Sequence, residues 1–170
     1  LRQFLKTYNK TLPKELEDVV LGHSLASVPL FLRTLAEELR LFGVHEELSD
    51  RLAYYLESQT VDDLFERVLE RVEGDFGASV VESAMTAIWA SRSGLSETEL
   101  FGLTDLVPAT WAPIWHALEE TLLDSAGKIT FSHDYMRIAV SDRYLAGNNT
   151  LLDEGQSERA LRLRREAHMR

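Results

Sequence analysis

Five histidines are the side chains of this sequence best suited to proton transfer or metal binding at neutral pH. They are His23, His45, His116, His133 and His168. Two histidines that bind one metal from the same helix lie three or four residues apart, and no two of these have that spacing. The sequence also has no cysteine, which excludes a thiolate zinc site and cysteine catalysis. We therefore expect no metal site.

Carboxylates are the next candidates for chemistry, since adjacent pairs occur at 37–38, 46–47 and 119–120. Such pairs on amphipathic helices usually form solvated faces, and nothing marks one of them as a catalytic dyad. No Gly-x-x-x-x-Gly-Lys-[Ser/Thr] segment is present, because Gly127-Lys128 is followed by Ile129 in an expected turn. Without a phosphate-binding loop the chain alone cannot form a nucleotide-hydrolysing site, so we expect no catalysis.

The composition describes an acidic folded chain. Its 170 residues include 18 Lys and Arg against 28 Asp and Glu, a net charge of −10, and 45% are hydrophobic. A nucleic-acid backbone needs clustered cations, so it is a poor partner. No segment approaches the roughly 20 apolar residues of a membrane span, and the start has no signal-peptide layout. We expect a cytoplasmic protein, cut from a longer chain.

The first part of the chain, residues 1–73, has the spacing of a small all-helical unit. Its clearest helix opens at Thr60, a capping residue, and places apolar residues at i, i+3, i+4, i+7, i+8 and i+11. These are Val61, Leu64, Phe65, Val68, Leu69 and Val72. Shorter amphipathic segments precede it at 15–21, 29–42 and 48–56. Pro29 suits the first turn of its helix.

The second part, residues 75–147, has a different order of elements. Helices are expected at 78–91, from the Ser96-Glu97-Thr98-Glu99 capping box, at 108–123 and at 134–145. A turn at 124–128 separates two short strands. Helix, helix, helix, hairpin, helix is the order of a winged helix. The fold class is thus mainly α: a helical domain, then a winged-helix domain, then a linker at 148–170.

The expected recognition helix of this winged helix, residues 109–120, does not suit DNA. It contains no Lys or Arg and ends in two glutamates, while the hairpin supplies only Lys128. A basic cluster near the end of the sequence is explained by a solvated helix face: Arg159, Arg162, Arg164, Arg165 and Arg170. Three tryptophans at helical spacing are expected in the core. They are Trp89, Trp111 and Trp115.

Several segments across residues 10–145 resemble one family in the order in which they occur. Residues 27–40, SVPLFLRTLAEELR, are similar to the N-P-L-[FY]-L-x-x-L-x-E-E-L-R segment of STAND-class NTPases of the NACHT type, in the nephrocystin and telomerase-associated-protein group. Further similar segments are 42–48, 60–69, 91–100, 111–114 and 131–140.

This resemblance implies that the chain is one part of a larger, multidomain protein. In such proteins a phosphate-binding-loop domain precedes the helical domain and winged helix, and a sensor array follows. The two domains close over ADP, and exchange for ATP with magnesium swings the winged helix away and permits self-assembly. Pro29 matches the proline that lies against the nucleotide base, although Val28 replaces the usual asparagine. His133, in Phe131-Ser132-His133, matches the histidine that reaches the β-phosphate.

The physics of these two positions leaves alternatives open. A histidine between a strand and a helix start can direct its ring at an anion, and the helix N-terminus adds favourable partial charge. Such a contact would form only in the closed state and would bias a two-state equilibrium. The alternative for His133 is a helix-capping or core-edge histidine. Pro29 is a helix-starting proline under either interpretation.

Three functions therefore remain. The first is the regulatory lid and arm of a signal-transduction ATPase, whose partner is the nucleotide-binding domain of its own parent chain. That parent, and not this chain alone, would hold ADP or ATP. The second is a winged-helix regulator that binds nucleic acid, and the third is a helical adaptor for a protein partner, marked by an exposed apolar surface.

Overall fold

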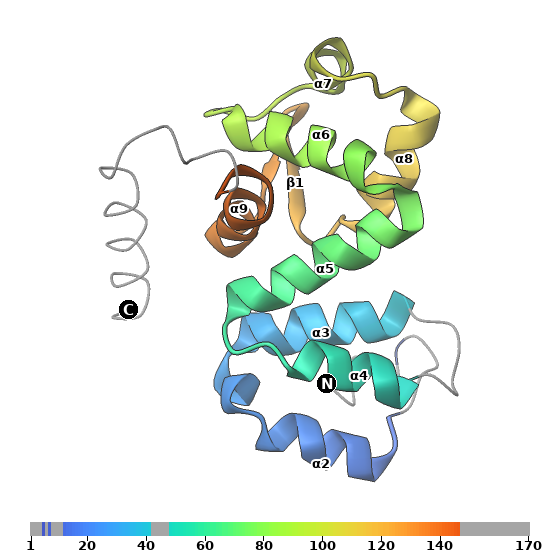
Figure 1. The fold of residues 1–170 in the computed structure, drawn as a ribbon, viewed down its shortest axis with the longest axis vertical. Helices are drawn as coiled ribbons and strands as arrows, with labels where there is room; N and C mark the ends of the chain where they lie inside the picture. Colours follow the sequence, from blue (N-terminus) through green and yellow to red (C-terminus); the bar gives the residue numbers. More distant parts are fainter. Residues whose placement is uncertain (1–4, 6, 8–11, 42–47, 147–170) are drawn as a thin grey trace.

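A computed structural model describes residue 5, residue 7, residues 12–41 and residues 48–146. The expected linker at 148–170, its arginine cluster, most of the 42–48 segment, His45 and His168 lie outside the described residues. The described chain is mainly helical with one antiparallel hairpin (Figure 1), which confirms the fold class expected from the sequence.

The first helices gather at one end of the molecule (Figure 1). They are α2 (Lys14–Gly22), the short 3-10 helix η1 (Ser24–Ser27), α3 (Pro29–Leu41) and α4 (Leu48–Leu56). Helix α5 (Val61–Phe76) lies between this group and the rest of the chain. The expected helices are therefore present, and Pro29 begins α3 as its type predicts.

Local side-chain chemistry fixes the start of α5. The hydroxyl of Thr60 accepts a hydrogen bond from the Asp63 amide at 3.2 Å, and the Asp63 carboxylate accepts one from the Thr60 amide at 3.0 Å. This reciprocal pair is a capping box, which satisfies backbone donors that the first helical turn leaves open. The cap expected at Thr60 is confirmed.

The second group of elements follows α5. It consists of α6 (Ala78–Ala90), α7 (Glu97–Leu103), α8 (Pro108–Ala117), strands β1 (Leu122–Ser125) and β2 (Lys128–Phe131), α9 (Asp134–Val140) and a π-helical segment, η2 (Ser141–Leu145). The strands pair antiparallel with Leu122 opposite Phe131. Ala126 and Gly127 both have positive φ, 54° and 76°, as a two-residue turn of this hand requires. The capping box of α7 and the hairpin are confirmed.

Helix α8 ends six residues earlier than the sequence predicts, at Ala117 instead of 123, so the expected recognition helix 109–120 is wrong in its last turn. The carbonyl of Leu118 accepts hydrogen bonds from the Thr121 amide and hydroxyl, both at 2.8 Å, and from the Leu122 amide at 2.9 Å. These bonds close a tight turn. Leu118 is still buried, so the apolar period continues past the helix end and could not reveal it.

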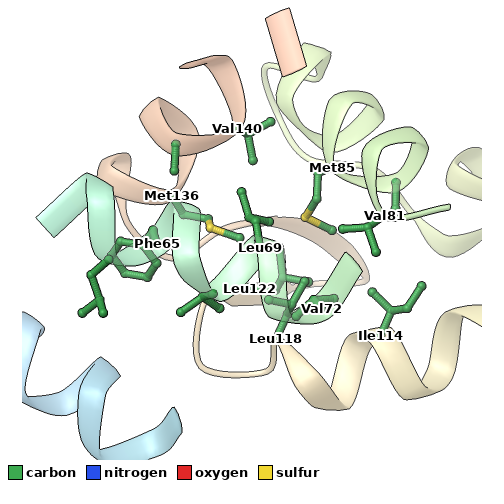
Figure 2. Close-up of a cluster of buried hydrophobic side chains, with 14 of the residues drawn as sticks. Phe65, Leu69, Val72, Val81, Met85, Ile114, Leu118, Leu122, Met136 and Val140 are labelled. Atoms are coloured by element: carbon green, nitrogen blue, oxygen red, sulfur yellow. The ribbon is translucent and has the colours of Figure 1, made fainter. Parts of the chain in front are cut away.

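The apolar core surrounds α5. Figure 2 shows Phe65 and Leu69 of this helix pointing toward Met136 of α9, and the same cluster includes Val81 and Met85 of α6. Trp111 is buried as expected, and Trp89 and Trp115 are partly buried against the core. Helix α5 packs against α3 on one side and α6 and α9 on the other. The domain division at residues 73–75 stays a prediction.

One backbone contact joins the α6–α7 loop to the hairpin. Leu95 and Ile129 exchange two backbone hydrogen bonds, of 3.0 and 2.7 Å. The preceding residue, Gly94, has φ +81°, and a Cβ there would lie 2.8 Å from the Ile129 carbonyl oxygen. Only glycine fits this conformation and this close approach. Gly94 therefore allows Leu95 to form an isolated β-bridge to the hairpin.

Candidate site between helix α3 and the hairpin

A surface cleft separates α3 from the end of α8 and the hairpin. Its walls come from α3 (Leu30, Arg33, Thr34, Glu37, Glu38, Arg40 and Leu41), from the α8 end and following turn (His116, Ala117, Glu119, Glu120 and Thr121), and from His133. Its volume is about 30 Å³, whereas pockets for drug-sized ligands measure roughly 300–1,000 Å³. By itself this cleft has no room for a nucleotide, so it can supply at most one wall of such a site.

His133 lines this cleft, whereas Pro29 does not. His133 is the N-cap residue of α9, but its side chain makes no capping hydrogen bond and is exposed. Neither the capping nor the core-edge alternative therefore describes it. Pro29 is exposed as well, and the residue after it, Leu30, lines the cleft. Asp134 places a negative charge beside His133, which weakens the helix N-terminus as an anion site.

Two ion pairs cross the cleft, and we call them the cleft ion pairs. Arg33 of α3 pairs with Glu120, and Arg40 of α3 pairs with Glu119 at 3.5 Å. Arg40 also donates to Glu37 within α3 at 2.6 Å. Exposed pairs of this kind contribute about 0–1 kcal/mol each and are screened by salt. The contact between α3 and the turn after α8 is therefore electrostatic and weak.

A buried network lies beneath the cleft. Glu38 accepts two hydrogen bonds from Arg71 of α5, at 2.6 and 3.0 Å, and one from the Tyr55 hydroxyl at 2.5 Å. Arg71 also donates to the Ala117 carbonyl at 3.3 Å and to Asp75 at 3.0 Å. Burial, followed by the Glu38 charge, raises the pKa of Tyr55 far above its usual value. The network joins α3, α4, α5 and the end of α8.

The sequence-based prediction for the two glutamates of α3 is wrong. Residues 37 and 38 were expected on a solvated face, yet Glu37 and Glu38 are both buried. The partner that balances Glu38, Arg71, is 33 residues away, so no local spacing reports the pairing. One signal was present: the apolar residues around them leave little of α3 for solvent, and a helix buried on most sides must pair its charges.

Other chemistry is limited in the described part of the chain. Among residues 12–41 and 48–146, no three His, Asp or Glu side chains gather in a way that could hold a metal ion. Within the same residues no helix is both long enough and apolar enough to cross a bilayer. The side chains that face the cleft can bind and orient a charged group.

Comparison with known proteins gives distant relatives. The chain is 28% identical over 151 residues to a TPR repeat-containing protein of Dictyostelium discoideum, 85% of this chain and 9% of that protein. It is 31% identical over 93 residues to telomerase protein component 1 of Mus musculus, 55% of this chain and 3% of that protein. Over 141 residues it is 28% identical to the Rattus norvegicus protein, 83% of this chain and 5% of that one.

The chain therefore spans less than a tenth of the length of these relatives. It matches none of the known family profiles, and no solved structure matches it. The similarity to telomerase protein component 1 agrees with the resemblance to the telomerase-associated-protein group, although it does not establish which fragment of such a protein this is. The chain is thus a mainly helical stretch with distant similarity to telomerase protein component 1.

Proposed function

We propose that this chain is the regulatory lid and arm of a signal-transduction ATPase of the STAND class, NACHT type. It closes over ADP held by a neighbouring nucleotide-binding domain of the same parent chain, moves when ATP with magnesium replaces ADP, and performs no catalysis itself. The observation that carries the proposal is the position of His133, which faces α3 across one cleft with its ring unused by the α9 cap.

The arrangement of the second group supports a winged helix. Helices α6, α7 and α8 precede the hairpin, α9 follows it, and Leu95 forms an isolated β-bridge to Ile129. Residues 97–117, which include the helix that would read DNA, contain no Lys or Arg. Because its would-be recognition helix has no cations, this winged helix suits a moving domain of a larger protein better than a nucleic-acid-binding domain.

The size of the cleft supports a shared site. A wall with two exposed histidines, His116 and His133, and two arginines can meet a phosphate group, but the space in this chain cannot enclose it. In the closed state a phosphate would compete with Glu119 and Glu120 for Arg40 and Arg33, because both arginines already pair with these glutamates. Nucleotide exchange would therefore act on the same charges that hold α3 to the turn after α8.

The test uses the longer chain of the same gene, extended upstream to include the expected nucleotide-binding domain. In this protein His133→Ala should accelerate ADP release about tenfold, the typical loss for one charge-assisted hydrogen bond. The matched control is His116→Ala, since His116 lines the same cleft and is exposed. Equal release rates for the two variants, or an upstream sequence without a phosphate-binding loop, would contradict the proposal.

The chain alone provides a second test. With ATP and magnesium it should show no turnover above the uncatalysed rate, measured by phosphate release. Sustained turnover by the purified chain would contradict the lid assignment, because a lid contributes contacts to a site that another domain builds.

A further inference from the structure

Helix α8 has one face that is exposed but carries no formal charge. Ala109, Ala112 and Pro113 are exposed at i, i+3 and i+4, on the side opposite the buried residues Trp111 and Ile114. A helix face in contact with water ordinarily carries charged residues. His116, the next position on this face, lines the cleft, so the uncharged surface begins where the cleft ends.

Two large apolar side chains that precede α8 in the chain are also exposed. Leu103, the last residue of α7, is 68% exposed, and Val107, the N-cap of α8, is 53% exposed. We call Leu103, Val107, Ala109, Ala112 and Pro113 the α8 face. Exposed apolar surface that is continuous along the chain and edged by polar residues marks interaction sites.

The segment that forms α7 and α8 itself carries only negative formal charges. Residues 97–117 contain the carboxylates Glu97, Glu99 and Asp105 and no Lys or Arg. Glu99 is used by the α7 cap and by Lys128 at 2.6 Å, and the Lys128 contact lowers its pKa to about 2. Glu97, at the start of α7, and Asp105, in the loop between α7 and α8, are exposed.

The backbone of the α8 face adds an acceptor. Pro113 has no N–H, so the Ala109 carbonyl receives no helical hydrogen bond from that position. Carboxylates and an open carbonyl all accept hydrogen bonds. A partner that covers this face must therefore bring donors and positive charge together with an apolar stripe.

We propose that the α8 face docks a cationic amphipathic helix of a protein partner. The apolar stripe of that helix packs on Leu103, Val107 and Ala112, and its Lys or Arg residues reach Glu97 and Asp105. A second copy of this chain is disfavoured, because a two-fold contact would bring the same carboxylates together. Nucleic acid is disfavoured by the absence of cations from residues 97–117. This inference does not depend on the lid proposal.

The test uses two fluorescent 14-residue peptides that form amphipathic helices of the same pattern, one of leucine and lysine and one of leucine and glutamate. The lysine peptide should bind the chain, and the glutamate peptide should not. The double variant Leu103→Ser, Val107→Ser should weaken binding of the lysine peptide about tenfold or more, because it removes both anchors.

A matched double variant controls for nonspecific binding of the peptide to exposed apolar side chains. Val19 and Leu21 of α2 are 55% and 61% exposed, so Val19→Ser, Leu21→Ser removes equal apolar exposure from another face. It should leave the affinity within about twofold, as expected for a surface outside the contact. Circular dichroism checks that both double variants keep their helices. Equal losses in the two double variants, or equal binding of the two peptides, would overturn the proposal.

The salt dependence of peptide binding tests the role of the two carboxylates. Glu97→Gln, Asp105→Asn should flatten the dependence of the affinity on salt concentration, since each lost ion pair reduces that dependence. Sedimentation of the chain alone should show a monomer. A dimer that Leu103→Ser, Val107→Ser dissociates would instead make a second copy the occupant and overturn the cationic partner.

Discussion

The two attachments of the hairpin-bearing half to the rest of the molecule differ in kind. On one side α5 packs Phe65, Leu69 and Val72 into the cluster formed with α6 and α9 (Figure 2). On the other side α3 meets the turn after α8 through the cleft ion pairs, Arg33–Glu120 and Arg40–Glu119. The first attachment excludes water, and the second is open to it.

This difference indicates which contact can change without unfolding. Loss of the apolar cluster costs several kcal/mol, because it combines lost burial with a cavity. Loss of an exposed ion pair costs about 1 kcal/mol or less and is reduced further by salt. We infer that the hairpin stays with α5, α6 and α9 when the contact between α3 and the turn after α8 opens.

The largest loss of stability is expected from a cavity in the apolar cluster around α5. Leu69→Ala in α5 should lower the free energy of unfolding by about 3 kcal/mol, within the range for a buried leucine. Urea titration followed by circular dichroism measures it. The control is Leu123→Ala on the exposed side of β1, which should cost less than about 1 kcal/mol. Similar losses at the two positions would show that the cluster does not dominate stability.

The buried network beneath the cleft should give the next largest effect. Glu38→Ala leaves the mostly buried Arg71 without its main partner, and removing one member of a buried pair costs about 3 kcal/mol. Glu57→Ala is the control. Glu57 is exposed and pairs with Arg67, which lies on α5 as Arg71 does, so this substitution should cost less than about 1 kcal/mol. If Glu38→Ala is as mild as Glu57→Ala in urea, the network does not hold α3 on α5.

Glu73 gives a pH-dependent effect on the apolar side. Hydrogen bonds from Arg143 and Tyr144 outweigh its burial and lower the pKa of Glu73 below the usual 4.5. Its stabilising effect is therefore complete above about pH 5 and is lost as the pH falls through the lower folded-state value. Glu73→Gln should reduce stability at pH 7 by about 1 kcal/mol, with the difference shrinking below pH 4. A difference that grows on acidification, in unfolding curves from pH 7 to pH 3, would reverse the expected sign.

The smallest change in stability is expected at the cleft ion pairs. Arg33→Ala and Glu119→Ala, which break the two pairs without leaving the buried Glu37 unpaired, should each cost less than about 1 kcal/mol at low salt and almost nothing in 1 M NaCl. Thermal unfolding at the two salt concentrations measures this. If either variant costs as much as Leu69→Ala, or if its effect does not fall with salt, the α3 contact is not the weak attachment.

Much of the fold could be predicted because its signals are local. The caps at Thr60 and Ser96 pair residues three positions apart, and the hairpin turn needs Gly127 within two residues of each strand. The end of α8 could not be predicted, since the turn that stops it depends on Leu118, whose apolar period suits a helix equally well. The hydrogen bonds from Thr121 and Leu122 to the Leu118 carbonyl form the turn instead of a further helical turn.

In the candidate site, too, local features could be predicted from the sequence and pairings between distant residues could not. Sequence segments single out Pro29 and His133. The structure places His133 in the lining of the cleft and Pro29 outside that lining, while their roles stay predictions. The pairing of Glu38 with Arg71 joins residues 33 positions apart, and the cleft ion pairs join residues about 80 positions apart. Such charges look solvated in a sequence until the chain is folded.

One distance measurement tests the central claim, which is that the α3 contact opens while the apolar side stays closed. The chain has no cysteine, so pairs of spin labels can be placed at exposed serines. The pair Ser24→Cys, Ser125→Cys spans the cleft side, and the pair Ser79→Cys, Ser125→Cys lies within the hairpin-bearing half. On raising NaCl to about 1 M, where the Debye length is near 3 Å, the first distance distribution should lengthen or broaden and the second should not. Two unchanged distributions, or two that broaden together, would contradict the account.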